Sequence, residues 1–320
     1  MTWVKLGLIF VPTGDLPWAR THAAVPFVAT VGELARVYFS ARDDRNRSHL
    51  GSFLLDLNAP FRIINVSPEP ALGLGALGSF DDNGVMATSI VTHDQRDYLY
   101  YGGWALGVTV PFYVNVGLAV RDRGEAVFRR LSPAPLFDRN VVDPYLTHSP
   151  FVLRDESLWR MWYASGTGWR LRAGAVQHRY HIKYAESADG VTWKRTGKVC
   201  IDFASDEEYA LARPCVVKDV DRYRMWYCCR GDRYRIGYAE SDDGVVWVRR
   251  DACGGLDVSA TGWDSEMIEY PFVFDHHSRR YMLYNGNDYG RTGIGLAILH
   301  EAAGSPKADG ALNEDLPFLR

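Results

Sequence analysis

Short stretches in which polar and apolar residues alternate run through the whole chain, and aromatic residues fill many of the apolar positions. Two stretches, residues 159–193 and 223–247, share Arg-Met-Trp-Tyr, a polar turn, Ile-x-Tyr-Ala-Glu-Ser and Asp-Gly before Val-x-Trp. Strand-length alternation with aromatic residues predicts pleated, partly buried strands. The Asp-Gly pairs at 189–190 and 243–244 supply the positive φ angles of tight turns. Each stretch therefore predicts a small antiparallel meander.

The meander recurs at intervals of roughly sixty residues, a period typical of propeller blades. Units open near residues 22, 84, 148, 213 and 269. The last unit has three evident strands, at 271–274, 280–285 and 292–299, while the N-terminal strand 3–11 has no partner. Adding that strand to the last unit would close the ring and remove open edges. The prediction is an all-β, five-bladed β-propeller of four-stranded antiparallel blades over residues 1–303, closed by the N-terminal strand, with a tail at 304–320.

Composition narrows the functional classes. The chain has 36 basic and 39 acidic residues and a net charge of −3, which gives no electrostatic case for binding nucleic acid or an anionic membrane. Five cysteines without a Cys-x-x-Cys pair indicate neither a disulfide framework nor a zinc site. The N-terminal apolar run is too short for a signal peptide, and no stretch approaches a spanning helix, so we expect a cytoplasmic protein. No cofactor or metal is predicted.

The chain resembles the five-bladed β-propeller glycosidases of families 43 and 32 and the related family 130 mannoside phosphorylases. The residues that carry the resemblance are the proline-containing unit openings, the Met-Trp-Tyr strands, the two Ala-Glu-Ser-x-Asp-Gly-Val-x-Trp hairpins and segment 42–48. It covers most of the chain and implies an active site at one end of the central channel. In those glycosidases an aspartate base, an aspartate that tunes pKa and a glutamate acid converge there. One carboxyl protonates the leaving oxygen while another activates water or attacks the sugar.

Three carboxylates are the catalytic candidates that the resemblance suggests. Glu269, in Glu-Tyr-Pro, is similar to the family's Glu-x-Pro acid and is the predicted proton donor. Asp143, which precedes a proline, and Asp82, which opens the second unit, are candidates for the second carboxylate. Turn chemistry explains both aspartates equally well. The first unit departs from the family, because its opening has His22 where the glycosidases place an aspartate.

A set of positive and polar residues is predicted to bind substrate near the channel mouth. Arginine forks onto phosphate or carboxylate, so this set predicts an anionic or phosphate-bearing sugar or a nucleotide sugar. Pairing with acidic residues inside the fold would explain the arginines as well. The set comprises His22, Arg42, Arg47, His148, Arg179, His181, Arg213, Glu266, Asn287 and Arg291.

The favoured function is a glycoside hydrolase-like enzyme that cleaves a glycosidic bond. One alternative is a glycoside phosphorylase, because attacking phosphate would make the missing first-unit aspartate unnecessary. The other is a non-catalytic glycan-binding propeller or a polysaccharide-biosynthesis enzyme with altered chemistry. Two carboxyl groups about 5 to 10 Å apart across the channel would support glycosidase chemistry. A channel of histidine, arginine and aromatic residues would favour binding or another reaction. Some propeller glycosidases hold a channel cation, but no ligand spacing here predicts one.

Overall fold

The structure is a computed structural model that describes residues 1–31, 33–58 and 61–300. The predicted tail at 304–320 lies outside the described residues. Regular structure in the described part consists almost entirely of β-strands, which confirms the all-β prediction. The two exceptions there are the short 3-10 helix η1 (Asp251–Cys253) and the four-residue turn α1 (Asn287–Gly290). None of the described helices has the length and apolar character needed to cross a membrane.

Hydrogen bonding groups the strands into three sheets. One eight-stranded sheet contains β2 (Thr21–Val31), β3 (Leu34–Arg42), β4 (Ser48–Asp56), β5 (Arg62–Val66), β6 (Gly84–His93), β7 (Arg96–Leu106), β8 (Phe112–Asp122) and β9 (Arg129–Arg130). The other contains β10 (Thr147–Asp155), β11 (Leu158–Arg172), β12 (Ala175–Ser187), β13 (Trp193–Ile201), β14 (Ala210–Lys218), β15 (Tyr223–Arg230), β16 (Tyr234–Ser241) and β17 (Val248–Arg249). The four-stranded sheet contains β1 (Thr2–Phe10), β18 (Glu269–His276), β19 (Arg279–Asn285) and β20 (Ile294–His300).

Each eight-stranded sheet is two antiparallel meanders joined by one parallel residue pair, Ser48 with Gly84 and Tyr180 with Ala210. The described strands therefore form four-stranded antiparallel units. Unit one is β2–β5, unit two β6–β9, unit three β10–β13 and unit four β14–β17. Unit five is β18–β20 with β1, whose Thr2 pairs with His300. The N-terminal strand thus pairs where the sequence predicted it.

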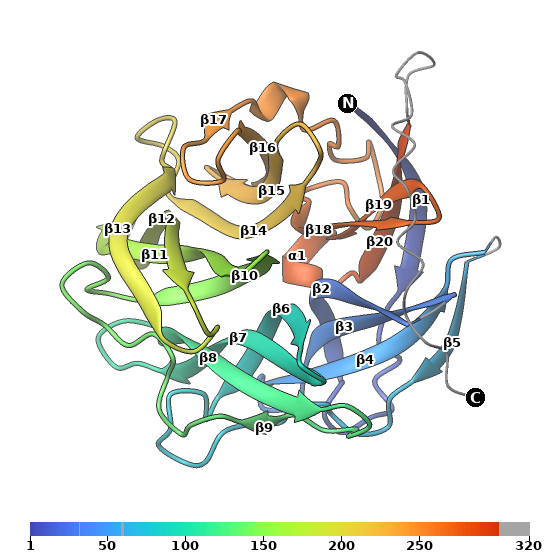
Figure 1. Ribbon diagram of the computed structural model, residues 1–320, viewed down its shortest axis with the longest axis horizontal. Helices are drawn as coiled ribbons and strands as arrows, with labels where there is room; N and C mark the ends of the chain where they lie inside the picture. The colour runs from blue at the N-terminus through green and yellow to red at the C-terminus, as the bar shows by residue number, and fades with distance from the viewer. Residues whose placement is uncertain (32, 59–60, 301–320) are drawn as a thin grey trace.

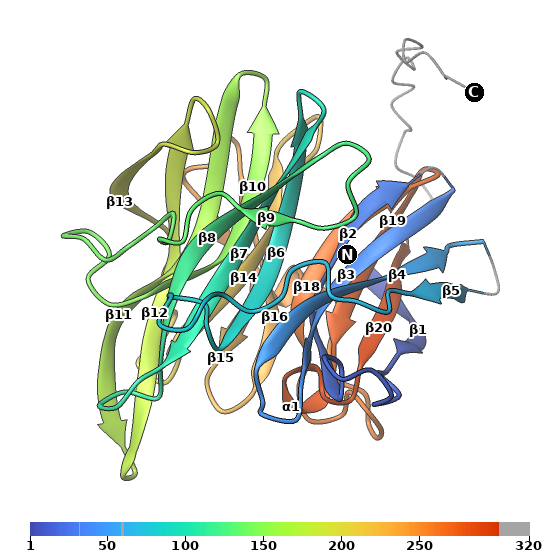
Figure 2. The ribbon, with the colours of Figure 1, turned by 90° about the horizontal axis from the view of Figure 1, so that it is seen from below.

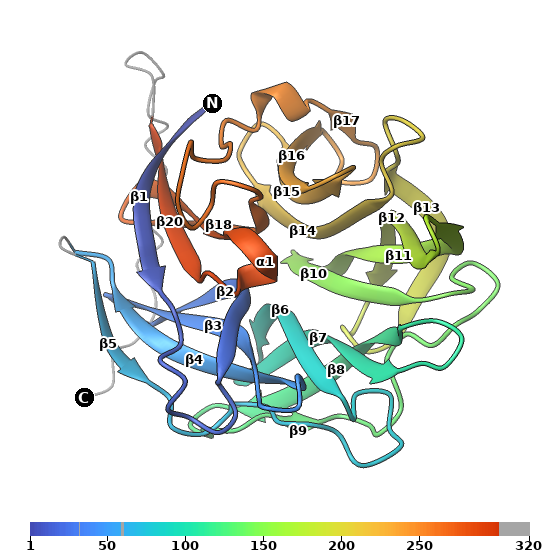
Figure 3. The same ribbon diagram turned by 180° about the vertical axis from the view of Figure 1, so that it is seen from behind.

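The units surround a central axis, with one strand of each unit innermost (Figure 1). The inner strands are β2, β6, β10, β14 and β18; each contacts the next, and β18 contacts β2. Figure 2 shows the strands running from one end of the molecule towards the other, with α1 at one end. Seen from behind, α1 lies near the axis beside β18, β2 and β10 (Figure 3). The N-terminal ends of the inner strands meet at this end.

Repeated contacts fasten neighbouring units together. Trp162 is fully buried, and its indole N–H donates a 2.8 Å hydrogen bond to the carbonyl oxygen of Gly244 in the next unit. Tyr100 makes the same 2.8 Å contact with Gly190. Both glycines have positive φ, 75° and 76°, as the Asp-Gly turns predicted. Each turn therefore docks on an aromatic residue of the unit before it.

An aspartate with the same kinds of partner also recurs in four of the units; it is buried in three of them and half-buried at Asp251. In each, the tyrosine of the second strand donates its hydroxyl to the aspartate, which pairs with a basic residue of the fourth strand. The sets are Asp81 with Tyr101 and Arg130, Asp143 with Tyr163 and Arg195, Asp251 with Tyr227 and Arg249, and Asp264 with Tyr284 and Lys5. The repetition shows that these aspartates hold the outer strands of the units in place.

Candidate active site

Bulges in the inner strands shape the end of the axis where α1 lies. Val25, Ser149, Arg213 and Tyr270 have φ between 50° and 55°, and each precedes a proline. This left-handed conformation is rare for side chains other than glycine, and a following proline disfavours helical backbone further. The strand register shifts at all four places, as in a β-bulge. Bulges of this kind re-aim side chains, and strain of this kind gathers at functional sites.

The bulges leave backbone groups without ladder partners, and side chains from neighbouring units fill the gaps. Arg213 is fully buried, and its guanidinium donates to the carbonyl oxygens of Thr88 at 3.0 Å and Pro26 at 2.9 Å. Burial lowers the pKa of Arg213 to about 10, so it stays charged at neutral pH. The amide oxygen of Asn285 accepts a 2.9 Å hydrogen bond from the Val25 backbone N–H. Arg213 thereby ties unit four to units one and two.

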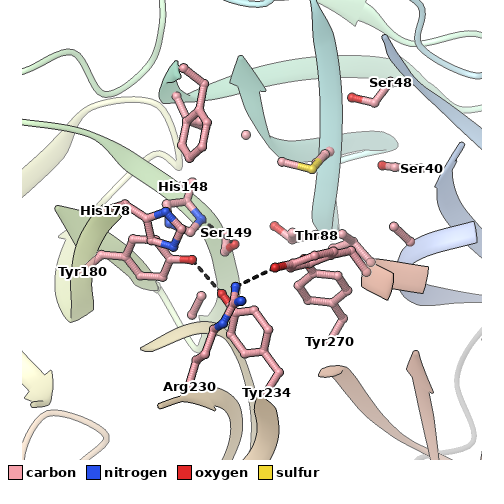
Figure 4. A pocket seen from close by; sticks show the side chains of 18 of the residues that line it. Ser40, Ser48, Thr88, His148, Ser149, His178, Tyr180, Arg230, Tyr234 and Tyr270 are labelled. Carbon is pink, nitrogen blue, oxygen red and sulfur yellow. Dashed lines mark hydrogen bonds between the residues drawn. The ribbon is translucent and has the colours of Figure 1, made fainter. Parts of the chain in front are cut away.

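A cavity of about 360 Å³ opens beside these bulges, and all of the units contribute to its wall. This volume falls within the roughly 300–1,000 Å³ of small-molecule sites. Figure 4 shows His148, His178 and Tyr180 on one side of the cavity, with Thr88 and Tyr270 opposite. The other aromatic and charged lining residues are Phe112, Tyr234, Tyr289, Arg42 and Arg230. No aspartate or glutamate is among the described residues that line it.

The histidines of the cavity are neutral. Their rings lie 4.5 Å (His148) and 4.7 Å (His178) from the Tyr180 ring, measured between centroids. Burial, helped by the other histidine, lowers the pKa of His148 to about 3, and burial with the Arg230 charge lowers the pKa of His178 to about 4. Neutral imidazole both donates and accepts hydrogen bonds, so these side chains suit the hydroxyl groups of a polar ligand.

Arg230 is held by aromatic rings instead of carboxylates. Its guanidinium lies 5.0 Å from the ring centre of Tyr234 and 5.5 Å from that of Tyr289, and it donates a 2.6 Å hydrogen bond to the Tyr289 hydroxyl. Tyr289 belongs to α1, where Asp288 and Tyr289 both have left-handed φ, 57° and 59°. Two successive strained residues therefore place Tyr289 against the arginine.

Glu269 lies directly before the cavity residue Tyr270. Its carboxyl group is fully buried, and no donor in the described part of the chain has hydrogen-bonding geometry to either oxygen. Burial raises the pKa of Glu269 well above its usual range; the Arg230 charge and the nearby Tyr289 backbone N–H oppose this more weakly. The group is a carboxylic acid that keeps its proton at pH values where exposed glutamates have lost it.

The structure brings some of the predicted residues to this end of the axis. Arg42 and His148 line the cavity, whereas Glu269 is not part of its wall but lies close to the wall residues Arg230 and Tyr289. His22 lies close enough to Arg42 and Arg291 that their charges, after burial, lower the pKa of His22 to about 4. These five residues are the part of the predicted site that the fold gathers in one place.

The remaining predicted residues do not line the cavity. Arg213 is buried as described, and the others make contacts of their own elsewhere in the fold. Three form ion pairs: Arg47 with Asp43 at 2.7 Å, His181 with Asp202 at 3.1 Å and Glu266 with Arg233 at 3.3 Å. The guanidinium of Arg179 lies 4.1 Å from the ring centre of Phe203. Asp82 and Asn287 each accept a 2.9 Å hydrogen bond from a backbone N–H, of Gly78 and Glu266 respectively.

Strand periodicity explains one group of misses. His178 and Tyr180 line the cavity, whereas the predicted Arg179 and His181 alternate with them along β12 and face the other side. Arg230 was also missed, although the sequence carries a signal for it. Residues 36–42, Arg-Val-Tyr-Phe-Ser-Ala-Arg, align with residues 224–230, Arg-Met-Trp-Tyr-Cys-Cys-Arg, so Arg230 occupies the position of Arg42 in its unit.

Asp143 is the aspartate of the repeated set in unit three. Its oxygens accept from Ser165 at 2.7 Å and Tyr163 at 3.0 Å, and they pair with Arg195 at 3.1 Å and Lys183 at 3.3 Å. We expect Asp143→Asn to lower the free energy of unfolding by about 2 kcal/mol, because the buried Lys183 and the half-buried Arg195 lose their counter-charge. Urea unfolding measures this. A fully stable variant that has lost all activity would instead make Asp143 catalytic.

Two further features lie away from the cavity. Glu33, His276 and His277 bring possible metal-ligand atoms within 4.8 Å of one another, at the opposite ends of β2 and β18 from the cavity. A second cavity, of about 820 Å³, lies between units one and two. Its wall contains both basic and acidic residues, and Arg121 there is paired with Asp97 at 2.6 Å. Neither feature adjoins Glu269.

Comparison with known proteins finds close relatives without an assigned function. No protein-family model matches the chain. Two uncharacterized proteins of Mycobacterium tuberculosis, MT1551 of strain CDC 1551 / Oshkosh and Rv1502 of strain ATCC 25618 / H37Rv, are each 46% identical over 300 residues. The match covers 93% of this chain and 99% of each relative.

Solved structures with a similar fold include several glycoside hydrolases. One named "Glycoside hydrolase" is 19% identical, with a TM-score of 0.72, over 96% of this chain and 95% of that one. A thermostable family-43 glycoside hydrolase is 16% identical, with a TM-score of 0.63, over 96% and 98%. A family-43 enzyme from Xanthomonas citri, complexed with xylose, is 17% identical, with a TM-score of 0.62, over 91% and 91%. At these identities the likeness shows a glycosidase-like propeller fold.

Proposed function

We propose that this chain, which belongs to the same family as the uncharacterized Mycobacterium tuberculosis proteins MT1551 and Rv1502, is a carbohydrate-active enzyme that cleaves a glycosidic bond. We count each four-stranded unit as one blade, which makes the architecture a five-bladed propeller closed by β1. Its glycoside hydrolase neighbours support a carbohydrate ligand, and the cavity at the end of the axis is the place we propose for it.

The observation that carries the proposal is the buried carboxyl group of Glu269. A general acid for glycosidic cleavage must hold its proton until the bond between the anomeric carbon and the leaving oxygen breaks. Burial provides this by raising the pKa of Glu269, and neither oxygen is committed to a donor in the described structure. In the proposed step, Glu269 gives its proton to the leaving oxygen and becomes a carboxylate, which the Arg230 charge stabilises.

The other cavity residues have binding roles in this proposal. The tyrosine rings offer flat apolar faces for a sugar ring, and Tyr180 and Tyr234 are linked through their hydroxyl oxygens at 2.8 Å. Neutral His148 and His178 can donate to and accept from sugar hydroxyls. These groups would orient the bond towards Glu269.

The group that attacks the sugar does not come from a second carboxylate in the described cavity wall. Two-carboxylate chemistry places the carboxyl groups about 5 to 10 Å apart across the bond. Because the wall holds histidine, arginine and tyrosine and no acid, the attacking group enters with solvent or substrate. The same observation favours phosphorolysis, in which phosphate attacks, as a second candidate function.

Mass spectrometry of oligosaccharides, glycosides and nucleotide sugars after incubation with the protein tests the proposal. Each substrate is run with and without inorganic phosphate, beside Glu269→Gln and the matched control Glu266→Gln, a change of the same type at an exposed site. We expect cleavage by the parent and the control and none by Glu269→Gln. Products that carry phosphate would identify a phosphorylase. If no substrate changes mass, or Glu269→Gln cleaves as fast as the parent, the proposal fails and a non-catalytic glycan-binding function replaces it.

A further inference from the structure

We propose that Arg42 and Arg230 form an anion-binding subsite in the cavity, and that the sugar bound there carries a carboxylate, phosphate or sulfate group. The identity of the ligand as a sugar rests on the function proposed above. The anion subsite itself rests on the positions, partners and surroundings of the two arginines.

The two arginines occupy equivalent positions on either side of unit five. Arg42 ends β3 in unit one, and Arg230 ends β15 in unit four; both follow the second-strand aromatic pair by three residues. Units one and four both border unit five, because β18 contacts β2 and β14. Both arginines line the cavity, together with Tyr270 and Tyr289 of unit five.

Neither arginine has a carboxylate partner in the described part of the chain. The hydrogen bonds described for their side chains go to neutral oxygens, from Arg42 to the Asn46 amide at 2.6 Å and from Arg230 to the Tyr289 hydroxyl at 2.6 Å. The buried Nε of Arg230 has no acceptor there. By contrast Arg224, at the other end of β15, pairs with Asp219 and Asp221. A guanidinium offers five N–H donors, so most of the donors at the cavity stay free for a ligand.

The surroundings strengthen the attraction for an anion. The described wall contains no acidic residue to cancel the two charges, and Glu269 behind it is held neutral by burial. Tyrosine rings displace water around Arg230, and electrostatic attraction is stronger where the local dielectric is low. Near Arg42 and His22, Arg291 adds a third positive charge and Asp288 adds one negative charge, so the net charge there stays positive. The planar guanidinium of arginine is well suited to bidentate hydrogen bonding with carboxylate or phosphate.

Calorimetric titration with matched sugars tests this inference. Glucose, galactose and mannose are compared with their uronic acids and 6-phosphates, and inorganic phosphate is titrated alone. We expect anionic sugars to bind at least about tenfold more tightly than the neutral sugar of the same configuration, with the difference shrinking in salt. Arg42→Gln and Arg230→Gln should each weaken the binding of anionic sugars about tenfold, and should weaken the binding of the matching neutral sugars much less. Arg45→Gln, an exposed arginine in the loop after β3, is the matched control.

The outcomes separate the subsite from the proposed reaction. Thermal unfolding checks that each variant folds. If Arg230→Gln does not fold, Arg42→Gln alone still tests the inference. The inference is overturned if no anionic sugar binds more tightly than its neutral partner, or if both variants behave like Arg45→Gln. Arginine-dependent binding of inorganic phosphate alone supports the subsite and assigns the anion to free phosphate. If the mass spectrometric test finds no cleavage, arginine-dependent binding of anions is still a valid result. If the calorimetric test finds no anion subsite, Glu269-dependent cleavage is still a valid result.

Discussion

We expect Arg213→Ala to lower the free energy of unfolding by about 4 kcal/mol, the largest stability effect that we predict for this protein. Two costs add up. The alanine leaves a cavity at a fully buried position, and the carbonyl oxygens of Thr88 and Pro26 lose their donors. Those carbonyls belong to bulged strand segments, so the sheets offer no replacement partner. Urea unfolding followed by tryptophan fluorescence measures the loss.

Arg213→Met separates the two costs. Methionine fills most of the space but donates no hydrogen bond, so we expect it to lose about 2 kcal/mol, roughly 1 for each orphaned carbonyl. Methionine also removes a buried charge that has no carboxylate partner among the described residues. If Arg213→Met proves as stable as the parent, the free energy lost by burying the charge equals the free energy gained from its hydrogen bonds. The link between units would then make no net contribution to stability.

We expect Glu269→Gln to lower the rate of cleavage by about 10²- to 10⁴-fold, the contribution typical of a general acid. The same change should stabilise the protein progressively as pH rises. Folded Glu269 keeps its proton above the usual range, whereas the unfolded chain releases that proton above its ordinary pKa of 4.5. The folded state then binds more protons than the unfolded state, so this group makes stability fall with rising pH. Glutamine does not titrate and escapes the loss.

The measurement is the difference in unfolding free energy between Glu269→Gln and the parent, from about pH 5 to about pH 8. The difference should move in favour of the variant by up to about 1.4 kcal/mol for each pH unit until folded Glu269 ionises. His148 and His178 also make stability depend on pH: their lowered pKa values make stability fall as pH drops below their ordinary pKa of 6.5. Both proteins contain these histidines, so their contribution cancels in the difference. A constant difference across this range would mean that Glu269 is ionised in the folded protein.

The repeated sequence pattern predicted most of the fold. Alternation and Asp-Gly turns located the strands, and the unpaired N-terminal strand indicated the pairing of β1 with β20. These features depend on residues close together in the sequence or on a regular repeat, so they can be recognised in a single sequence. The repeated aspartates were harder to interpret, because Asp143 before a proline looks the same in the sequence whether it has a catalytic role or belongs to a repeated structural contact. Only the shared tyrosine and basic partners of the four units reveal the repeat.

The residues that line the cavity were predicted only in part, for geometric reasons. Glu269, Arg42 and His148 stand at unit openings or strand ends, where position along the repeat fixes position in space. Arg179 and His181 do not line the cavity, because a shift of one residue along a strand reverses the face on which a side chain lies. Arg213 shares its place in the repeat with Ser149 and Tyr270, which line the cavity. Its long side chain reaches inwards to bulged carbonyls, and no pattern in the sequence records that direction.

The pairing of β1 with β20 has a consequence for how the protein folds during its synthesis. A ribosome makes a chain from its N-terminal end, so Thr2 is synthesised long before its partner His300. The sheet that bears Glu269 and Tyr270 therefore stays incomplete until β20 has been synthesised, and β1 remains an unpaired edge strand until then. The sheet that contains Glu269 is thus completed later than the other two sheets, so a chain truncated before β20 would lack part of the structure beside the cavity.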